Sequence, residues 1–441
     1  MLAEPATLAW CEPASTPLRV ALLLSGGVDS AVALHLLRAA GHEVTAFYLK
    51  IWFEEDFENS WAACPWDADV AACTAVCAAA SVPLRLVPLT RAYWDRVVTE
   101  CVADLKAGRT PNPDVLCNAR VKFGAFVEAL EAGSIEGCSS APGTPLGGFD
   151  RVASGHYARI DRRGGGTGPS TSPSFRLAAA ADPVKDQTYF LARLSPAQLG
   201  VAMFPLGGLS KGGVRDIAAA LSLPNASRPD SQGLCFLGKV KFDEFVRAHL
   251  GEWPGPLIDA DEGTVVGFHG GAWFFTPGQR RGVRLAGGPW YVVAKDMGTN
   301  AVYVSRRYHN EGGVEGGDAR GDGDAARRAA SLSRRRAFRV RDLAWLPGAG
   351  PHVAARPLRV KVRHGPASHG CALALDGGGD GTTGSVALDA LDQGLAPGQY
   401  AVFYEGGACV GAGVIESQGV WERGEGMGFA ASPPPATAAA V

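Results

Sequence analysis

The first half of the chain alternates between short apolar runs and longer segments in which apolar positions recur with helical spacing. Runs typical of buried strands occupy Val20–Leu24, Val44–Lys50, Leu84–Pro88 and Arg151–Ser154. The helical spacing covers Val28–Ala40, Asp67–Ala80, Tyr93–Ala107 and Val121–Ala132. Strands and helices in this alternation predict an α/β fold with a doubly wound parallel sheet, whose ligand site lies at the carboxyl edge of the strands.

The pattern changes after residue 235, where short bursts of aromatic and β-branched residues replace the helical segments. Short antiparallel strands are predicted at Thr264–Phe268, Ala272–Thr276, Trp290–Ala294 and Ala301–Ser305. A second group is predicted near Leu358–Arg363, Cys371–Leu375, Val386–Leu388, Tyr400–Tyr404 and Ala408–Ile415. We therefore predict an α/β domain over residues 18–238, a small central β-rich domain over 239–307, a linker over 308–336, a β domain over 337–416 and a mobile tail over 417–441.

The composition fits a chain of two or three domains with polar insertions. The 441 residues are 46% hydrophobic and 20% charged, and no apolar run approaches the ~18 residues that span a bilayer. Glu311–Ala330 is a Gly, Ala, Asp and Arg tract that cannot bury a core. Gly137–Gly148 and Arg162–Ser174 are rich in Gly, Pro and Ser and are interpreted as surface insertions.

The charge and the cysteine content exclude few classes of function. The formal net charge is −2, yet residues 334–363 hold nine Lys or Arg residues, which fits either a phosphate-binding face or a solvated surface. Ten cysteines do not make a disulfide scaffold, and no Cys-x-x-Cys occurs. Cys73 and Cys77, four residues apart in a predicted helix, are better explained as buried small residues than as metal ligands.

A glycine-rich stretch, Ser25-Gly26-Gly27-Val28-Asp29-Ser30, joins the first predicted strand to the first predicted helix. Backbone N–H groups at such a turn lie at the positive end of the helix dipole, where phosphate binds. The serine hydroxyls can add donors, and Asp29 can hold Mg²⁺ on the phosphates. The stretch resembles the pyrophosphatase loop of ATP enzymes that adenylate their substrate, although six residues alone also fit an ordinary strand–helix turn.

Further motifs follow in order along the chain. The first, Arg109–Asn118, has prolines at positions 111 and 113 and is predicted to be a rigid, exposed loop that contains Cys117. The others are Ala153–Tyr157, Val184–Leu191, Asp230–Phe236, Thr276–Gly282, Trp290–Val293 and Pro397–Tyr404. Together with the first loop they resemble the tRNA-specific 2-thiouridylases, which replace the C2 oxygen of the wobble uridine with sulfur. The resemblance runs from about Val20 to Glu416. It implies an ATP-pyrophosphatase domain, a small central domain and a C-terminal β-barrel that contacts tRNA.

The resemblance also implies roles for individual residues. A persulfide on Cys235 would carry the sulfur, Cys117 would attack either C2 or that persulfide, and Asp114 would move a proton. The ATP site would comprise Leu23, Leu24, Ser25, Gly26, Gly27, Val28, Asp29, Ser30, Leu49 and Gly155, with Asp29 as the Mg²⁺ ligand. The tRNA contacts would be Asn112, Pro113, Asp114, Lys185, Asp186, Gln187, Arg363 and His364. His364 departs from the family, because many bacterial members have Tyr there.

The implied partners are tRNAs with a wobble uridine, expected from the family to be those for Lys, Glu and Gln, and a persulfide donor such as a cysteine desulfurase or a sulfur relay protein. A monomer is expected. The segment 52–66 is longer and more aromatic than in bacterial members and resembles plant and algal ones, so we expect a mitochondrial or chloroplast enzyme, or a cytoplasmic one if the source is bacterial. Two alternatives stay open: another ATP-pyrophosphatase enzyme, or a tRNA-binding factor without activity. Release of pyrophosphate that depends on tRNA would distinguish them.

Overall fold

A computed structural model describes residues 5–12, 16–51, 66–138, 143–163, 174–229, 242–308, 335–377 and 381–416. Cys235 lies outside the described residues, as do most of the aromatic segment 52–66, the low-complexity tract 311–330 and the tail 417–441. None of the described helices is long and apolar enough to cross a membrane.

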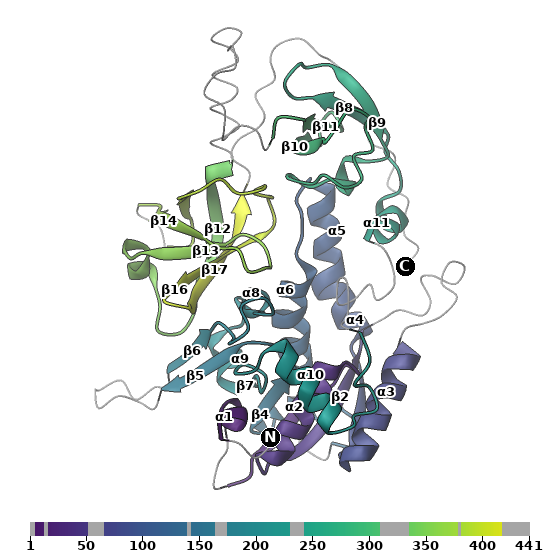
Figure 1. Ribbon diagram of the computed structural model, residues 1–441, viewed down its shortest axis with the longest axis vertical. Helices are drawn as coiled ribbons and strands as arrows, with labels where there is room; N and C mark the ends of the chain where they lie inside the picture. The colour runs from purple at the N-terminus through teal and green to yellow at the C-terminus, as the bar shows by residue number, and fades with distance from the viewer. Residues whose placement is uncertain are drawn as a thin grey trace.

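The N-terminal half contains the parallel sheet that the sequence predicts (Figure 1). Its strand order is β3-β2-β1-β4-β7, with β1 at Arg19–Leu23, β2 at Glu43–Lys50, β3 at Leu84–Pro88, β4 at Arg151–Ser154 and β7 at Ala202–Met203. Every neighbouring pair is parallel. Alternate residues of β1 enter two different hydrophobic clusters, Ala21 and Leu23 on one side and Val20 and Leu22 on the other. Both faces of the sheet are therefore buried, which explains why its central strand is an unbroken apolar run.

Helices cover the two faces. On the first face lie α2 (Val28–Ala39), α3 (Trp66–Ala80) and α10 (Lys211–Ala220). On the second lie α4 (Thr90–Tyr93), the π-helical η2 (Trp94–Val98), α5 (Thr99–Lys106), α6 (Pro113–Cys117), the π-helical η3 (Asn118–Ala125) and α7 (Phe126–Glu131). Shorter elements are η4 (Pro145–Gly148), α8 (Thr188–Leu191) and α9 (Pro196–Val201). The predicted helix at Val121–Ala132 thus begins at Pro113, eight residues earlier.

The middle unit is small and mostly antiparallel. It contains α11 (Phe242–Leu250) and a sheet ordered β10-β11-β8-β9, with β8 at Gly255–Asp259, β9 at Val265–His269, β10 at Tyr291–Asp296 and β11 at Ala301–Ser305. β8 and β11 pair in parallel, contrary to the antiparallel expectation. The predicted strand Ala272–Thr276 is wrong, because Ala272–Phe274 forms the 3₁₀ turn η5, which buries Ala272 and Trp273.

The C-terminal unit is a closed six-stranded barrel. Its order is β12-β15-β14-β13-β16-β17, and β12 pairs with β17 to close the ring. The strands are β12 (Ala337–Trp345), β13 (Leu358–Lys361), β14 (His369–Leu375), β15 (Gly384–Leu388), β16 (Tyr400–Glu405) and β17 (Ala408–Glu416), with the 3₁₀ turn η7 at Pro351–Ala355. A hairpin from the first domain, β5 (Arg159–Arg163) and β6 (Ser174–Ala178), pairs with β17 at Ala178 and Ala408. The two ends of the predicted insertion 162–174 are therefore strands, and this hairpin joins the α/β domain to the barrel.

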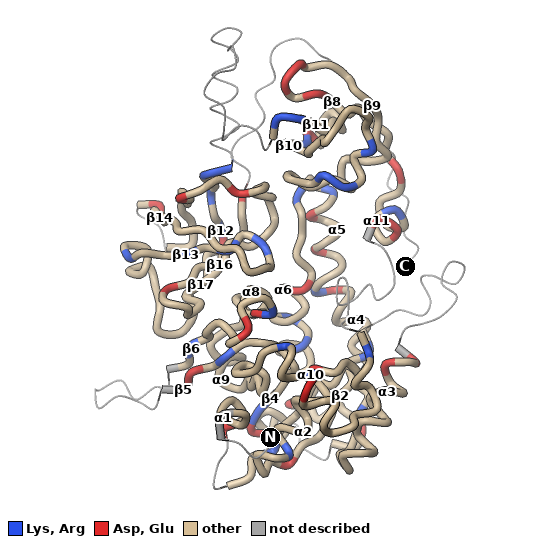
Figure 2. The backbone as a smooth tube through the Cα atoms, viewed as in Figure 1, with Lys and Arg blue, Asp and Glu red and all other residues tan. Residues whose placement is uncertain are grey.

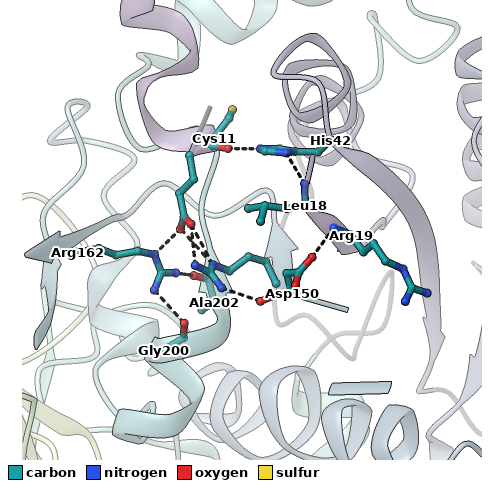
Figure 3. Close-up of polar contacts among 10 residues, drawn as sticks. Cys11, Leu18, Arg19, His42, Asp150, Arg162, Gly200 and Ala202 are labelled. Carbon is teal, nitrogen blue, oxygen red and sulfur yellow. Dashed lines mark hydrogen bonds and ion pairs between the residues drawn. The ribbon is translucent and has the colours of Figure 1, made fainter. Parts of the chain in front are cut away.

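The segment before β1 packs on the edge of the sheet opposite the carboxyl ends. It comprises α1 (Pro5–Leu8) and the 3₁₀ turn η1 (Ala9–Cys11). Glu12 forms ion pairs with Arg151, at 2.9 Å, and with Arg162, which is labelled in Figure 3. The Nε2–H of His42 donates to the carbonyl oxygen of Cys11 at 2.6 Å. These contacts attach the segment to the α/β domain.

Candidate active site

The glycine-rich loop lies where the strand order of the sheet reverses. β1 has β2 on one side and β4 on the other, and the chain passes from β1 through α2 to β2. The loops that follow β1 and β4 therefore diverge at their carboxyl ends. This divergence forms the crevice in which open α/β sheets bind ligands.

The loop is shaped to present backbone N–H groups. Gly26 has a φ of 77°, a conformation that favours glycine. The hydroxyls of Ser25 and Ser30 lie 3.2 Å apart, and Ser30 Oγ donates to the carbonyl oxygen of Gly27 at 3.1 Å. Gly27 is the N-cap of α2 and provides no side-chain cap. The first-turn N–H groups of α2 therefore lack a side-chain acceptor at their cap, which suits them to an incoming anion.

Asp29, in the first turn of α2, is held by Tyr157 of the motif Ala153–Tyr157 and by Lys211, which the sequence did not identify. Lys211 Nζ lies 2.7 Å and 2.9 Å from its two carboxylate oxygens, and Tyr157 Oη donates to Oδ1 at 2.8 Å. Lys211 begins α10, where Ser210 is the N-cap. An ammonium and a carboxylate so close to the loop fit a Mg²⁺–phosphate group, because Mg²⁺ is commonly held by one carboxylate, phosphate oxygens and water. Within the described ranges no three His, Cys, Asp or Glu side chains gather as a metal site of their own.

Gly155, directly after β4, lies against the start of α2. A Cβ at this position would lie 2.8 Å from the backbone nitrogen of Ser30, so a larger residue would push α2 away. Leu23, Leu24 and Val28 are buried, and Leu49 is half-buried near the end of β2. Only the backbone of these buried residues is suited to contact a nucleotide.

The loop is also supported from the segment that leads toward Cys235. The carbonyl oxygen of Gly26 accepts hydrogen bonds from Asn225 Nδ2 at 2.9 Å and from Arg228 Nη1 at 3.1 Å. Arg228 forms an ion pair with Asp69 of α3. The described chain ends at residue 229, six residues before Cys235. The last described residues before this gap therefore lie beside the nucleotide loop.

Cys117 lies in a helix and not in the exposed loop that the sequence suggested. Asn112 is the N-cap of α6, its Oδ1 accepts from the backbone of Val115 at 3.2 Å, and Pro113 occupies the first turn. This arrangement is a standard helix start. Cys117, at the last position of α6, is 1% exposed. The π-helical η3 follows it directly, and such irregular turns are frequent at functional sites.

Burial determines the ionisation of Cys117. It raises the pKa of the thiol to about 11, while Lys122 acts to lower this pKa and Asp114 to raise it. Cys117 is therefore a protonated thiol at neutral pH in this conformation. Lys122 also helps to lower the pKa of His156, which desolvation already holds well below its usual value. The ring of Phe204 contacts the rings of both Phe123 of η3 and His156, each at 6.0 Å between centroids, so the helix that follows Cys117 packs near the loop after β4.

The barrel contacts the segment that contains Asn112 and Asp114. Asn112 Nδ2 donates to Gln399 Oε1 at 3.1 Å, and Gln399 Nε2 donates to the carbonyl oxygens of Thr110 and Pro111. The ring of His364 stacks on Phe190 at 4.5 Å between centroids. Burial lowers the pKa of His364, Lys361 adds to this effect, and the charges of Asp186 and Asp114 oppose it. Asn118, next to Cys117, donates through Nδ2 to the carbonyl oxygen of Phe190 at 3.2 Å, so Phe190 links the helix of Cys117 to His364.

Three predicted tRNA contacts in the motif Val184–Leu191 have different positions. Asp186 is 3% exposed and forms an ion pair with Lys361 of β13 at 2.8 Å, so its carboxylate does not face solvent in this conformation. Gln187 accepts the backbone N–H of Tyr157 through Oε1 at 2.9 Å. Lys185 and Gln187 are both partly exposed, whereas Asp186 is buried. Asp186 joins the barrel to the α/β domain, and Gln187 positions the tyrosine that holds Asp29.

The arginine cluster of the barrel is not an open basic face. Arg363 pairs with Asp392 and donates to the carbonyl oxygen of Gly394 at 2.6 Å. Arg339 and Arg356 pair with Asp376 and Glu405 at 2.6 Å and 3.0 Å. Arg335 is buried and donates to backbone carbonyl groups, and Lys361 pairs with Asp186. Each acidic partner is distant in sequence, so the sequence pattern could not reveal this neutralisation.

Comparisons with known proteins agree over about nine-tenths of the chain. Three family models match, described as tRNA methyl transferase HUP domain over residues 18–239, tRNA methyl transferase PRC-barrel domain over 243–306 and Aminomethyltransferase beta-barrel domain over 335–415. A tRNA-specific 2-thiouridylase of Bacteroides thetaiotaomicron is 38% identical over 406 residues, which cover 90% of this chain and 99% of that protein. One of Porphyromonas gingivalis is 38% identical over 401 residues, with 90% and 98% covered. The solved NMN synthetase of Francisella tularensis is 16% identical, covers 55% of this chain and 79% of its own, and has a TM-score of 0.30.

Proposed function

Because this chain belongs to the tRNA-specific 2-thiouridylase family, we propose that it replaces the C2 oxygen of the wobble uridine of tRNA with sulfur, at the expense of ATP. The family models mention methyl transfer, whereas the full-length relatives are named thiouridylases. The nucleotide loop and the cysteines at positions 117 and 235 favour sulfur transfer. The observation that carries the proposal is that the segment Asn112–Asn118, which contains Asp114 and Cys117, contacts both the barrel and its neighbour Phe190. Asn112 donates to Gln399 of the barrel, and Asn118 donates to the carbonyl oxygen of Phe190, on whose ring His364 stacks.

The ATP step follows from the chemistry of uridine. The C2 carbonyl is a poor electrophile and its oxygen is a poor leaving group, and adenylation of that oxygen corrects both defects. The loop Ser25–Ser30 and the start of α2 would bind the phosphates. Asp29 would hold Mg²⁺ on them, and Lys211 would stabilise the negative charge that develops on the departing pyrophosphate.

The sulfur step requires two cysteines. A terminal persulfide sulfur on Cys235 is more acidic than a thiol and is largely ionised at neutral pH. The Cys117 thiolate would attack the inner sulfur of the Cys235 persulfide, which breaks that S–S bond, releases the terminal sulfur as hydrosulfide and leaves a Cys117–Cys235 disulfide. The hydrosulfide would then attack C2 of the adenylated uridine, and AMP would leave with the former C2 oxygen. Asp114 would move the proton near the base. Each transfer leaves an oxidised pair, so a reductant is required in every turnover.

The compartment and the partners are part of the proposal. The aromatic segment 52–66 and the low-complexity insertions support a mitochondrial or chloroplast enzyme encoded in the nucleus. A cysteine desulfurase or a sulfur relay protein would supply the persulfide, and the enzyme would act as a monomer. Nucleoside mass spectrometry of organellar and cytosolic tRNA after loss of the protein would test the compartment, because 2-thiouridine would disappear only from the organellar fraction.

The simplest test of the reaction is to measure the release of pyrophosphate from ATP. The protein should release pyrophosphate from ATP when a tRNA with a wobble uridine is present, and should release little with a tRNA whose wobble base is cytidine. Equal release with both tRNAs would favour another ATP-pyrophosphatase reaction. Tight tRNA binding without any release would favour a tRNA-binding factor without activity.

A further inference from the structure

The loop Thr276–Arg284 of the middle unit is basic, because three of its nine residues are arginines and none is acidic. Arg280, Arg281 and Arg284 are all exposed. None of the three side chains forms an ion pair or a hydrogen bond with another described residue, whereas the exposed barrel arginines Arg339 and Arg356 each pair with a carboxylate. Figure 2 shows basic residues where the middle unit approaches the upper end of α5.

The loop is rigid, and Gln279 is the residue that fixes it. Gln279 Oε1 accepts from the backbone nitrogen of Thr276 at 2.9 Å, and its Nε2 donates to the carbonyl oxygen of Arg281 at 2.8 Å. The backbone of Gln279 and Gly278 exchanges two further hydrogen bonds with Val292 of β10, at 2.9 Å and 2.8 Å. The arginines therefore project from a fixed backbone, so little backbone entropy is lost when a ligand binds them.

The position of the loop connects it to the reaction. Thr276 Oγ1 lies 3.2 Å from Thr110 Oγ1, two residues before Asn112. On its other side a Cβ at Gly278 would lie 2.5 Å from the carbonyl oxygen of Gln393, so the loop also packs against the barrel segment that binds Arg363. The three arginines thus lie at the junction of all three units, next to the segment that carries Asp114.

We propose that Arg280, Arg281 and Arg284 bind the phosphate backbone of the tRNA and set its position relative to the catalytic segment Asn112–Cys117. This proposal rests on the proposed function, in which tRNA is the substrate. Exposed guanidinium groups without a carboxylate partner favour phosphate, because no intramolecular ion pair has to be broken when RNA binds. The contacts are independent of sequence and position the RNA, while the segment Asn112–Asp114 reads the base.

The test is the salt dependence of tRNA binding by the full chain. In the double variant Arg280→Ala/Arg281→Ala, the slope of log K against log salt should fall by about two units. The ratio of the wild-type affinity to the variant affinity should therefore fall about 16-fold when the salt concentration rises from 50 to 200 mM. The variant Arg280→Lys/Arg281→Lys keeps both charges and should retain the wild-type slope. Arg91→Ala, an exposed arginine of α4 that pairs with Asp95, is the matched control and should leave the slope unchanged.

Two results are decisive against the proposal. Equal slopes and affinities for the wild type and the double alanine variant would contradict phosphate binding by these arginines and would leave the proposed function untouched. A wild-type chain that binds no wobble-uridine tRNA would overturn the proposed function and this surface with it. Thermal melts should agree among all four proteins, because the two arginines hold no other described side chain in place.

Discussion

The buried ion pair between Asp186 and Lys361 gives the most quantitative prediction. Lys361 Nζ lies 2.8 Å from Asp186 Oδ2, and the two side chains are 11% and 3% exposed. The variant Lys361→Met keeps the aliphatic stem and removes the charge, so the Asp186 carboxylate stays buried without its cation. Removal of one partner from a buried pair costs about 3–5 kcal/mol.

The expected cost lies at the lower end of that range. Asp186 still accepts hydrogen bonds from the backbone nitrogen of Ala180 at 3.1 Å and from Thr188 Oγ1 at 2.9 Å. We therefore expect Lys361→Met to lower the free energy of unfolding by about 3 kcal/mol, which corresponds to roughly 6–12 °C in melting temperature. The double variant Asp186→Asn/Lys361→Met removes both charges and should recover more than half of this loss.

Differential scanning calorimetry measures the effect, with Arg91→Ala as the control. The pair of Arg91 and Asp95 is exposed, so its loss should change stability by less than about 1 kcal/mol. If Lys361→Met melts at the same temperature as Arg91→Ala, the pair does not join the two units. If Asp186→Asn weakens tRNA binding with no loss of stability, Asp186 contacts tRNA directly, as the resemblance first implied.

Three further predictions concern the active site. Asp29→Ala should lower tRNA-dependent pyrophosphate release about 100-fold or more because a phosphate-site charge is lost, and release at the wild-type rate would remove Asp29 from the site. Gly155→Ala should destabilise the protein by about 1–3 kcal/mol in a denaturation curve, since its Cβ would meet the backbone of Ser30, whereas Gly212→Ala on α10 should be neutral or stabilising. The pKa of Cys117 is about 11, so its alkylation in the tRNA-free protein, followed by mass spectrometry, should still accelerate between pH 9 and 10; a plateau by pH 9 would show that burial does not control this thiol.

Much of the α/β domain could be predicted because its signals are local. β1 is an apolar run whose alternate residues enter two cores, and it lies within one residue of the predicted strand. The start of α6 could also have been predicted, because Asn112 followed by Pro113 is a typical sequence signal for a helix N-terminus. The two prolines instead led to the prediction of a loop. That error placed Cys117 in an exposed loop, although it is buried. The hairpin β5–β6 was missed because β5 is polar and a Gly-, Pro- and Ser-rich segment separates the two strands.

Other features depend on contacts that no local pattern reveals. Lys211 lies 182 residues from Asp29, and Lys361 lies 175 residues from Asp186. The arginine cluster of the barrel looked like an RNA surface because its acidic partners are distant in sequence. The motif Thr276–Gly282 was recognised, but only the structure shows that its arginines lack such partners among the described residues.

Burial of Cys117 also changes how the central experiment must be designed. A serine at a site that is 1% exposed costs stability, about 1–3 kcal/mol if its hydroxyl finds no partner, so Cys117→Ala is needed beside Cys117→Ser. Both variants should be compared at a temperature where they are folded. Cys117→Ala leaves no polar atom to satisfy and separates the chemical role of the thiol from its packing.

The measurement that tests the account most directly is the fate of labelled sulfur. The full chain is incubated with ATP, a wobble-uridine tRNA, reductant and a cysteine desulfurase with labelled cysteine, and both nucleosides and peptides are analysed by mass spectrometry. The wild type should produce labelled 2-thiouridine. Cys235→Ser should accept no label at that site, and Cys117→Ala should retain label on Cys235 without passing it to tRNA. Labelled 2-thiouridine at the wild-type rate from Cys117→Ala would contradict the two-cysteine mechanism, and its absence with the wild type would contradict the proposed function.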